Sequence, residues 1–155
     1  MTQRTLVLHP DPILRSRCGA IGSVSEPVRK LAEEMLVVMY AAQGRGLAGP
    51  QVGEAHRIFV MDSGWKDGAA APVVCIDPEI TWESEDLVAM EERCLSLPDQ
   101  PRSVRRPDAI ELSWTDLDGE RITRRLDAAE ARIAQHEIDH LDGRLILDHP
   151  VAQAG

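Results

Sequence analysis

Apolar residues recur at helical spacing along residues 26–43. The recurring positions form one stripe, which consists of Val28, Leu31, Met35, Val38, Met39 and Ala42. A stripe of this kind is typical of an α-helix that packs on a core. Ser25 precedes the segment as a candidate N-cap, Pro27 is tolerated in the first turn, and Gly44 can end the helix. We therefore expect a helix from Glu26 to Gln43.

A second helical pattern covers residues 128–141. Asp127 is the expected N-cap, and Glu130 three positions later completes the pattern of a capping box. Gly143 is placed to stop this helix. One face of it contains polar as well as apolar residues, namely Ala129, Ile133, His136, Glu137 and His140. We expect the helix to turn these polar groups toward the interior.

Short apolar and β-branched runs between the two helices predict strands. The expected strands cover residues 57–62, 73–76, 87–90, 109–114 and 120–126, with a weaker one at 80–83. Residues 44–53 are rich in glycine and predict a turn after the first helix, and residues 116–119 predict a hairpin turn. The order of elements predicts an α+β fold, with mostly antiparallel, short-stranded sheets packed around the second helix as the central one.

The length and charge of the chain narrow the classes of function. A length of 155 residues fits one domain, and we expect residues 1–155 to form a single unit. The net charge of −9 argues against a surface that follows nucleic-acid phosphates. The densest basic stretch, which contains Arg102, Arg105 and Arg106, is short and is interpreted as a solvated strand edge. We expect no direct nucleic-acid binding.

Cysteine usage and hydropathy indicate the compartment. The chain has three cysteines without the spacing of a disulfide framework. The first ten residues lack the apolar run of a signal peptide, and no window approaches the length of a transmembrane span. We expect a cytoplasmic protein without membrane contact, because a free thiol persists in that reducing compartment.

The strongest chemical signal is an H-E-x-x-H segment, residues 136–140, inside the second helix. His136 and His140 lie on one helix face, about 6 Å apart along the axis, which lets both imidazoles bind one cation. Glu137 lies beside them, where it can handle the proton of a water activated by the ion. A pair of core histidines without a metal is disfavoured, because burying these polar groups is costly unless they gain strong partners. We expect both histidines to bind a metal.

Two histidines leave a third ligand to be found. The candidates are Cys94, Cys18, Cys75, His9, His56, His149 and an acidic residue. Cys94 follows a strand-like run and precedes a turn that could point its sulfur inward. A cysteine considered alone is more often a small buried hydrophobe. Sequence spacing by itself does not choose among these residues.

Three segments together resemble the peptide deformylase family, metalloenzymes that remove the N-formyl group from nascent polypeptides. Residues 44–51 resemble the glycine-rich first motif of the family, and residues 92–96 resemble its E-G-C-L-S second motif. Residues 135–143 resemble its third motif, which holds H-E-x-x-H. Order and intervals fit as well, and the similarity runs from about residue 6 to residue 148. Three motifs in order are a specific signal.

The resemblance implies the ligands and the catalytic groups. It implies that Cys94 completes the metal site with His136 and His140, that water takes the fourth position, and that ferrous iron is the natural metal, with zinc, nickel or cobalt able to replace it. It implies that the Gln51 amide and the Leu95 N–H stabilise the developing oxyanion, while Glu137 transfers the proton to the leaving amine. The substrate is then an N-formylated peptide. Its expected contacts are Gly44, Arg45, Gly46, Glu92, Arg93, Ala129 and Ile133.

The sequence departs from the family pattern at several places. Arg93 stands where the family usually has glycine, so the backbone there could be strained and the long cation could crowd or recruit substrate. Gly49 replaces a usual alanine. Ala129 and Glu130 stand where the family often has bulky apolar residues, near the pocket for the substrate's methionine side chain. Few residues follow Gly143, which argues against ribosome docking through a C-terminal helix.

These departures keep three alternatives beside hydrolysis of N-formylmethionyl peptides. The first is a deformylase-like amidohydrolase with another acyl substrate, in which Arg93 holds a carboxylate. The second is a protein that binds metal but has lost activity and serves as a binding module. The third is an ordinary H-E-x-x-H metallopeptidase, whose third ligand would not be Cys94.

Overall fold

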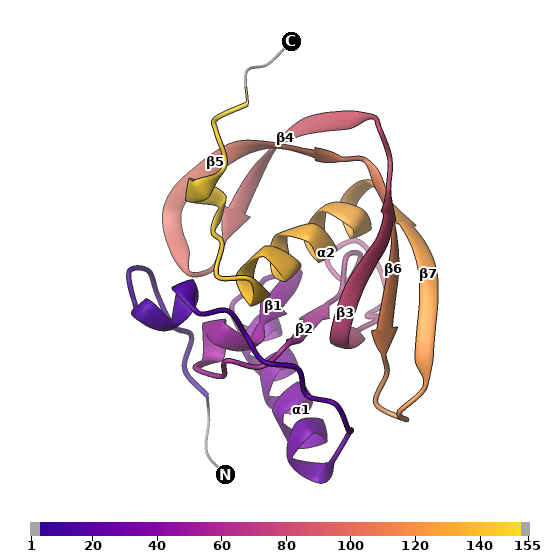
Figure 1. Ribbon diagram of the computed structural model, residues 1–155. Coiled ribbons are helices and arrows are strands. Elements are labelled where there is room, and N and C mark those ends of the chain that lie inside the picture. Colours follow the sequence, from indigo (N-terminus) through magenta and orange to yellow (C-terminus); the bar gives the residue numbers. More distant parts are fainter. Residues whose placement is uncertain (1–3, 153–155) are drawn as a thin grey trace.

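The computed structural model describes residues 4–152, and across this range it contains one five-stranded sheet, one two-stranded sheet and two α-helices (Figure 1). The large sheet has the order β1-β2-β3-β6-β7, with every neighbouring pair antiparallel. Its strands are β1 Gly46–Ala48, β2 Ile58–Met61, β3 Val73–Glu83, β6 Ala109–Thr115 and β7 Arg121–Asp127. The small sheet pairs β4 (Leu87–Cys94) with β5 (Leu97–Pro107). This arrangement confirms the expected α+β fold.

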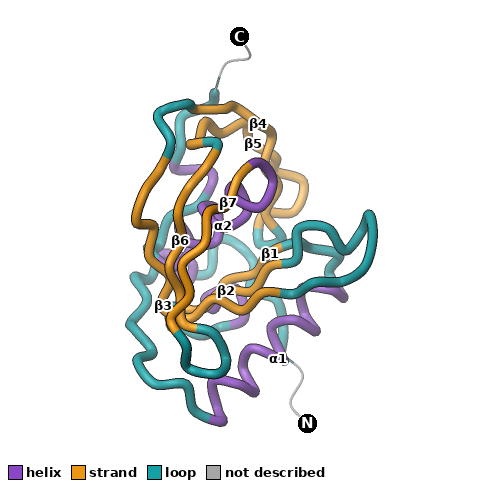
Figure 2. The backbone as a smooth tube through the Cα atoms, turned by 90° about the vertical axis from the view of Figure 1, so that its right-hand side faces the viewer, coloured by secondary structure: helices purple, strands orange, loops and turns teal. Residues whose placement is uncertain are grey.

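The two helices, α1 (Glu26–Ala41) and α2 (Ala128–Leu141), pack on opposite sides of the large sheet. Strand β2 shows this best, because all four of its residues are buried. Ile58 and Val60 pack in the same cluster as α1, whereas Phe59 and Met61 pack in the cluster of α2. The alternation of side chains along a strand sends successive residues to opposite faces. Figure 2 shows α2 behind the curved β3–β6–β7 part of the sheet.

Gly44, which was expected to end the first helix, lies beyond the end of that helix and against the turn that contains Leu95. Helix α1 ends at Ala41, and Gln43 adopts the left-handed conformation with a φ of 59°. The N–H of Gly44 then donates to the Met39 carbonyl at 2.9 Å. A Cβ on Gly44 would lie 2.6 Å from Cδ1 of Leu95. A side chain at this position would therefore displace the Leu95 side chain in the neighbouring turn, whereas the backbone of Gly44 has no positive φ that favours glycine.

The capping box expected at the start of α2 is absent from the described residues around it. Asp127 makes no side-chain capping hydrogen bond, because the chain passes through a left-handed conformation at Ala128, with a φ of 48°. Glu130 instead accepts a hydrogen bond from Arg124 at 2.6 Å. The limits of the helix, 128–141, agree with the prediction.

Strands β3 and β5 differ from what the sequence pattern indicates. The runs at 73–76 and 80–83 belong to one strand, β3, whose pairing with β6 has register shifts between Ile76 and Glu79 and between Ile80 and Trp82. Only the basic stretch of β5 was interpreted as a strand edge, whereas the strand runs from Leu97 to Pro107 and contains three prolines, which disfavour a strand interior. Proline is tolerated there because β4 is the one strand that pairs with β5 among the described residues.

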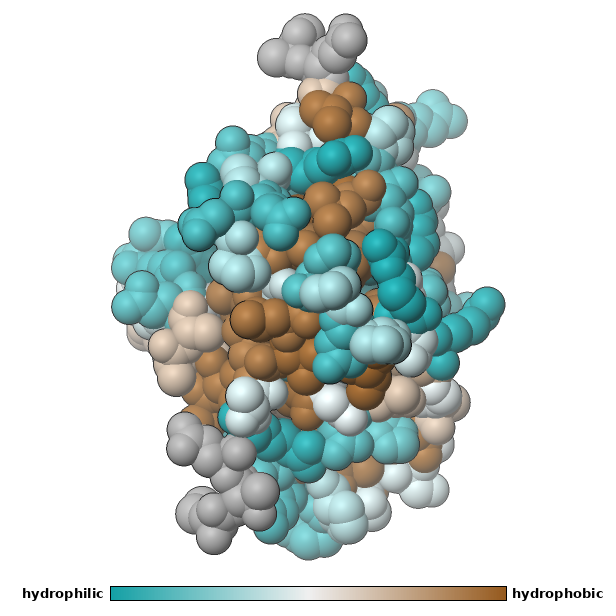
Figure 3. Space-filling model, turned by 90° about the vertical axis from the view of Figure 1, so that its left-hand side faces the viewer, coloured by the Kyte–Doolittle hydropathy of each residue, from teal (hydrophilic) through white to brown (hydrophobic). Residues whose placement is uncertain are grey.

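The β4–β5 hairpin packs against short 3-10 helices near both ends of the chain, η1 (Pro12–Arg15) and η3 (Ile146–Asp148), on the left-hand side of Figure 1. Their shared apolar cluster contains Leu14, Cys94, Leu97, Val104, Leu145 and Ile146. Seen from that side, apolar side chains gather in the middle of the surface within a hydrophilic surround (Figure 3). This packing fixes the end of β4. Within residues 4–152, no helix has both the length and the apolar character to cross a membrane.

Candidate metal centre and active site

Three buried side chains from two elements meet at one point. Cys94 is the last residue of β4, and His136 and His140 lie one turn apart on α2. One ligand atom from each residue lies within 4.8 Å of the others, and Cys94 Sγ is 3.4 Å from His140 Nε2. A thiol and two imidazoles are the donors that zinc and neighbouring transition metals accept, and a three-ligand set leaves a place for water or substrate. The residues therefore fit a catalytic metal ion.

The other candidates for the third ligand lie elsewhere. Among the described residues, the group close enough to hold an ion contains Cys94 and neither Cys18 nor Cys75. Cys75 is fully buried in the core between the sheet and α2, where burial raises the pKa of its thiol. His149 is held by Asp139 at 2.8 Å. The geometry thus selects the residue that spacing alone left undecided.

Glu92 orients one of the two histidines. Its Oε1 lies 2.9 Å from Nδ1 of His136, and its carboxylate also accepts hydrogen bonds from Arg106 and Arg132. Burial opposes ionisation of this carboxyl, but the hydrogen bonds from His136 and Arg106 outweigh it and lower the pKa of Glu92 to about 2. An ionised carboxylate can only accept, so Nδ1 of His136 carries the hydrogen and Nε2 is left for a metal.

Arg106 corrects the interpretation of the basic stretch as a solvated edge. Arg106 is 4% exposed, and it donates to Glu92 at 2.6 Å and to Asp139 at 2.9 Å. Arg102 also has a specific partner, because it donates to the His149 carbonyl at 2.8 and 3.1 Å. The signal that would have revealed Arg106 is its place two residues after the buried Val104, on the same face of β5.

Glu137 lies in the narrow space between α2 and β1. It is 5% exposed, and its Oε1 has no hydrogen-bond partner within the described part of the chain. Burial raises the pKa of Glu137 to about 7, although the charge of His136 acts in the opposite direction. A Cβ on Gly46 would lie 2.6 Å from Oε2 of Glu137. Only glycine at position 46 therefore leaves room for a carboxyl that can exchange a proton near neutral pH.

The electrostatics of the centre favour a bound cation. Burial would lower the pKa of His136, but the charge of Glu137 and the hydrogen bonds to Cys94 and Glu92 raise it above its ordinary value. Burial and the charge of His136 lower the pKa of His140 well below its ordinary range. The groups around His136 therefore stabilise a positive charge next to its ring. A metal ion can supply that charge in place of a proton.

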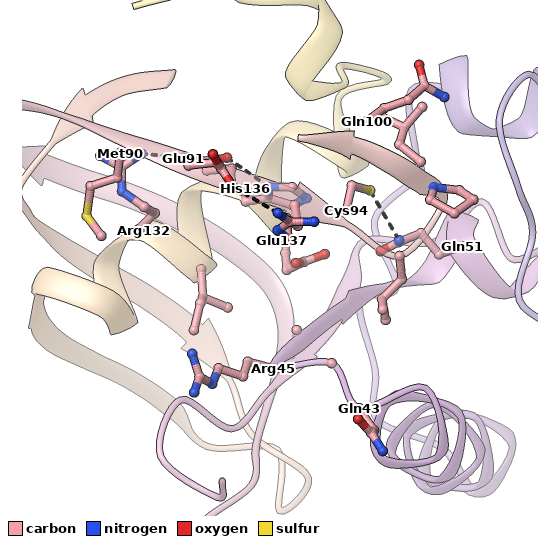
Figure 4. Close-up of a pocket in the computed structure, with 18 of the residues that line it drawn as sticks. Gln43, Arg45, Gln51, Met90, Glu91, Cys94, Gln100, Arg132, His136 and Glu137 are labelled. Carbon is pink, nitrogen blue, oxygen red and sulfur yellow. Dashed lines mark hydrogen bonds and ion pairs between the residues drawn. The ribbon is translucent and has the colours of Figure 1, made fainter. Parts of the chain in front are cut away.

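Gln51 approaches the centre from the short 3-10 helix η2 (Gly49–Val52), which follows β1. Its amide is almost completely buried, and Nε2 lies 3.8 Å from Cys94 Sγ, as the dashed line in Figure 4 shows. Its Oε1 accepts a hydrogen bond from the N–H of Ala48 at 2.9 Å. The N–H side of the amide therefore faces the sulfur, where it can donate to a ligand of the centre.

A cleft of about 560 Å³ opens beside these residues. Its walls come from the start of β1, the β4–β5 hairpin and the exposed side of α2, and they include every residue predicted to contact substrate: Gly44, Arg45, Gly46, Glu92, Arg93, Ala129 and Ile133. Leu95, Gln51 and Glu137 line it too. Strand β1 is at the edge of the large sheet. Its free edge can therefore pair with an extended peptide.

Arg93 lies at the mouth of the cleft and does not enter the centre. Its side chain is 72% exposed and forms an ion pair with Glu91 at 3.1 Å. Its φ is not among the positive values found in the described residues, so the backbone there does not need glycine. Arg93 therefore neither strains the backbone nor crowds the metal centre, although an arginine in place of the family's glycine suggested both.

Two further contributors were missed from the sequence. Arg132, one turn before His136 on α2, donates to Glu92 at 2.6 Å and to two backbone carbonyls of the hairpin. Trp65 donates from its indole N–H to the Gly44 carbonyl at 2.9 Å and so holds a long loop over the start of β1. The contribution of Arg132 could have been inferred from its position on the same helix face as His136. Nothing in the sequence pointed to the contribution of Trp65.

Comparison with known proteins identifies one family. The family model described as polypeptide deformylase matches residues 3–154. A peptide deformylase of Mesorhizobium japonicum is 42% identical over 149 residues, which are 96% of this chain and 85% of that protein. The crystal structure of peptide deformylase from Thermotoga maritima aligns with a TM-score of 0.91 and 36% identity, over 99% of this chain and 100% of that one. A Met-Ala-Ser-bound class I type b peptide deformylase from Acinetobacter baumannii aligns with a TM-score of 0.88 and 29% identity, over 96% and 99%.

Proposed function

The chain belongs to the polypeptide deformylase family, and we propose that it hydrolyses the formyl amide at the N-terminus of newly made, N-formylmethionyl peptides. The observation that carries this proposal is the meeting of Cys94, His136 and His140 beside Glu137 in a cleft next to the free edge of β1. The cleft supplies a place for the peptide, and the buried cluster supplies the reactive groups.

Cys94, His136 and His140 are the residues that would hold one divalent ion. Ferrous iron is the ion we propose, as the family resemblance implies, and zinc, nickel or cobalt suit the same donors. Such an ion, when bound, supplies a Lewis acid for the formyl carbonyl and lowers the pKa of the attacking water. Glu92 keeps the His136 ring in the orientation that this requires, through the 2.9 Å hydrogen bond to Nδ1. Glu92 thus acts through His136, although it was predicted to contact substrate.

The peptide is held as an added strand along β1. Gly46 brings its backbone close to the reactive groups because it has no side chain, and Gly44 and Arg45 continue the same edge toward the mouth of the cleft. Ile133 and Ala129, one and two turns before Glu137 on α2, line the part of the cleft proposed for the first side chain of the substrate. Ala129 leaves this part wide enough for a long, flexible side chain such as methionine.

The remaining groups carry out the proton transfers and stabilise charge. Glu137 takes a proton from the attacking water and delivers it to the nitrogen of the departing peptide. The Gln51 amide, whose N–H side faces the centre, donates to the formyl oxygen as this oxygen becomes negative. The backbone N–H of Leu95, next to Cys94 in the turn between β4 and β5, is the second proposed donor. The Gln51 amide is buried and fixed by hydrogen bonds in the structure, so it needs little rearrangement during the reaction.

The broader setting follows from this assignment. We propose that residues 1–155 act as a single metallohydrolase domain in the cytoplasm, where nascent formylated peptides are available. Arg93 is proposed to contact the peptide only beyond its first residue, because its side chain lies at the mouth of the cleft.

An assay of formate release tests the proposal. The protein is purified without oxygen, loaded with ferrous iron, and incubated with formyl-Met-Ala-Ser, with acetyl-Met-Ala-Ser and unmodified Met-Ala-Ser as matched controls. We expect one equivalent of metal and formate from the formylated peptide alone. Glu137→Ala should keep the metal but lose turnover by several orders of magnitude. Metal binding without formate release would contradict the proposed function, and cleavage of internal peptide bonds would instead support the metallopeptidase alternative.

A further inference from the structure

We propose that Ser96 is a positioning residue, which fixes the orientation of the Gln51 amide together with the backbone of the N-terminal segment at Val7. This inference rests on the proposed role of Gln51 in the reaction. Ser96 does not line the cleft, whereas Gln51, Cys94 and Leu95 do. Any effect of Ser96 on the reaction must therefore pass through a neighbour.

The hydroxyl of Ser96 joins two segments that are far apart in the sequence. Ser96 is completely buried in the turn between β4 and β5. Its Oγ lies 2.6 Å from the Val7 carbonyl oxygen and 3.0 Å from Nε2 of Gln51. The backbone strengthens the same junction, because the Val7 N–H donates to the Gln51 carbonyl at 2.7 Å and the His9 N–H donates to the Ser96 carbonyl at 2.8 Å. The N-terminal segment thus holds both residues from outside the cleft.

The chemistry of these groups sets the direction of each hydrogen bond. A carbonyl oxygen can only accept, so the Ser96 hydroxyl must donate its hydrogen to Val7. The Ser96 oxygen then accepts, and the Gln51 atom that faces it must be the nitrogen. On the other side of the amide, the Ala48 N–H can only donate, so the atom that faces it must be the Gln51 oxygen, as its 2.9 Å hydrogen bond requires. Both neighbours enforce the same orientation.

This orientation determines what Gln51 offers to the reaction. One of its two N–H groups is used by Ser96, and the other lies on the side of Cys94 Sγ, 3.8 Å from the nitrogen. A flipped amide would turn its oxygen toward the centre and repel a developing oxyanion. It would also point the NH2 group of Gln51 at the Ala48 N–H, and two buried donors that face each other are costly in the interior. Without the Ser96 hydroxyl, the amide keeps the Ala48 hydrogen bond and the long 3.8 Å contact with Cys94 Sγ, which hold it less firmly, so it can rotate away.

Kinetic measurements on Ser96→Ala test the inference. We expect kcat, expressed per bound metal, to fall by about tenfold, which is less than the loss of roughly 10²–10³ for removing an oxyanion donor outright. KM and metal content should stay near the wild-type values. Ser113→Ala is the matched control, because Ser113 is also a buried serine with side-chain partners but lies on β6, outside the cleft. Its kcat should not change.

A double-mutant cycle separates positioning from a general structural effect. In a Gln51→Ala background, Ser96→Ala should cause no further loss of kcat, because the group that it positions is absent. An equal loss in both backgrounds would overturn the proposal. Ser96→Thr, which keeps a hydroxyl, should restore most of the kcat lost in Ser96→Ala.

Nuclear magnetic resonance gives a readout that does not depend on turnover. In the zinc-loaded protein, the two side-chain amide protons of Gln51, identified by their loss in Gln51→Ala, should be distinct and protected from exchange with solvent. Ser96→Ala should remove that protection, whereas Ser113→Ala should not. Unchanged protection in Ser96→Ala would overturn the proposal. A wild-type protein without formate release but with this Ser96-dependent protection would refute the proposed function and still support the positioning of Gln51.

Discussion

Glu92 accepts a hydrogen bond from Nδ1 of His136 at 2.9 Å, and this contact links the metal centre to a buried ionic network. The same carboxylate binds Arg106 and Arg132, and Arg106 continues to Asp139. Two carboxylates thus face two guanidinium groups beneath the histidine. The charges of the network nearly cancel. Its hydrogen bond to Nδ1 sets the orientation of the His136 ring.

Glu92→Gln should destabilise both the fold and the centre. The amide keeps the shape of the carboxyl but leaves the buried Arg106 and the partly buried Arg132 short of negative charge, so we expect the free energy of unfolding to fall by about 3–5 kcal/mol. Metal affinity should weaken by about 10–100-fold, because the neutral amide oxygen is a weaker acceptor than the carboxylate for the His136 Nδ1–H. Urea unfolding and competition with a metal chelator measure the two effects. Glu91→Gln is the control, because Glu91 is exposed and its ion-pair partner, Arg93, is exposed too. Equal stability of the two variants would contradict this explanation.

Gly46→Ala should impair catalysis while leaving the fold intact. The new Cβ would lie 2.6 Å from Oε2 of Glu137 and 2.8 Å from Cγ2 of Ile133, so the Glu137 side chain must move. A displacement of about 1 Å from a productive position can lower the rate about 10²-fold. We expect a loss of kcat of that order, measured by formate release at saturating peptide. Gly64→Ala is the matched control, because nothing lies within 4 Å of a Cβ there. A wild-type kcat in Gly46→Ala would show that Glu137 does not need its observed position.

The sequence predicted the parts of this site that depend on local patterns. Helical spacing placed His136 and His140 on one buried face, and the family motif supplied Cys94. It could not place Glu92 or Arg106 in the network, because their partners come from β4, β5 and α2 and are joined only by the folded chain. The full length of strand β5 could not be predicted, because it contains prolines, which are tolerated mainly in strands at the edge of a sheet. A charge cluster in a sequence does not reveal which of its members are buried.

Arg93→Gly should leave the activity almost unchanged. The Arg93 side chain is exposed and paired with Glu91, and its backbone has no positive φ that would favour glycine. We expect kcat and KM for formyl-Met-Ala-Ser within a few-fold of wild type. The free energy of unfolding should fall by about 0.5–1 kcal/mol, because glycine is more flexible in the unfolded chain. Arg93→Ala provides the comparison without that flexibility. A large rise in kcat in both variants would show that Arg93 obstructs the substrate.

Tyr40 should titrate at unusually high pH. Burial and the 2.6 Å hydrogen bond that its hydroxyl donates to Asp62 raise the pKa of Tyr40 to about 12. The folded state thus favours the neutral phenol, and the resulting stability is complete below the ordinary pKa of about 10 and is lost as pH rises from there toward 12. The chain has one tyrosine, so ultraviolet absorbance reports its ionisation directly.

The tyrosine titration should be followed together with circular dichroism, so that only the folded protein is read. Asp62→Asn should lower the pKa of Tyr40, because it removes the negative charge beside the phenol. A folded wild-type protein whose tyrosine ionises near pH 10 would contradict the partly buried hydrogen bond between Tyr40 and Asp62.

The metal ligands can be identified by X-ray absorption spectroscopy of the zinc-loaded protein at one equivalent of metal. The site predicts one sulfur at about 2.3 Å and two imidazole nitrogens at about 2.0–2.1 Å, with a light atom from solvent in the remaining place. Cys94→Ala should remove the sulfur signal while the imidazole signal remains. A spectrum of the wild-type protein without sulfur, or with more than one, would contradict a centre built from Cys94, His136 and His140.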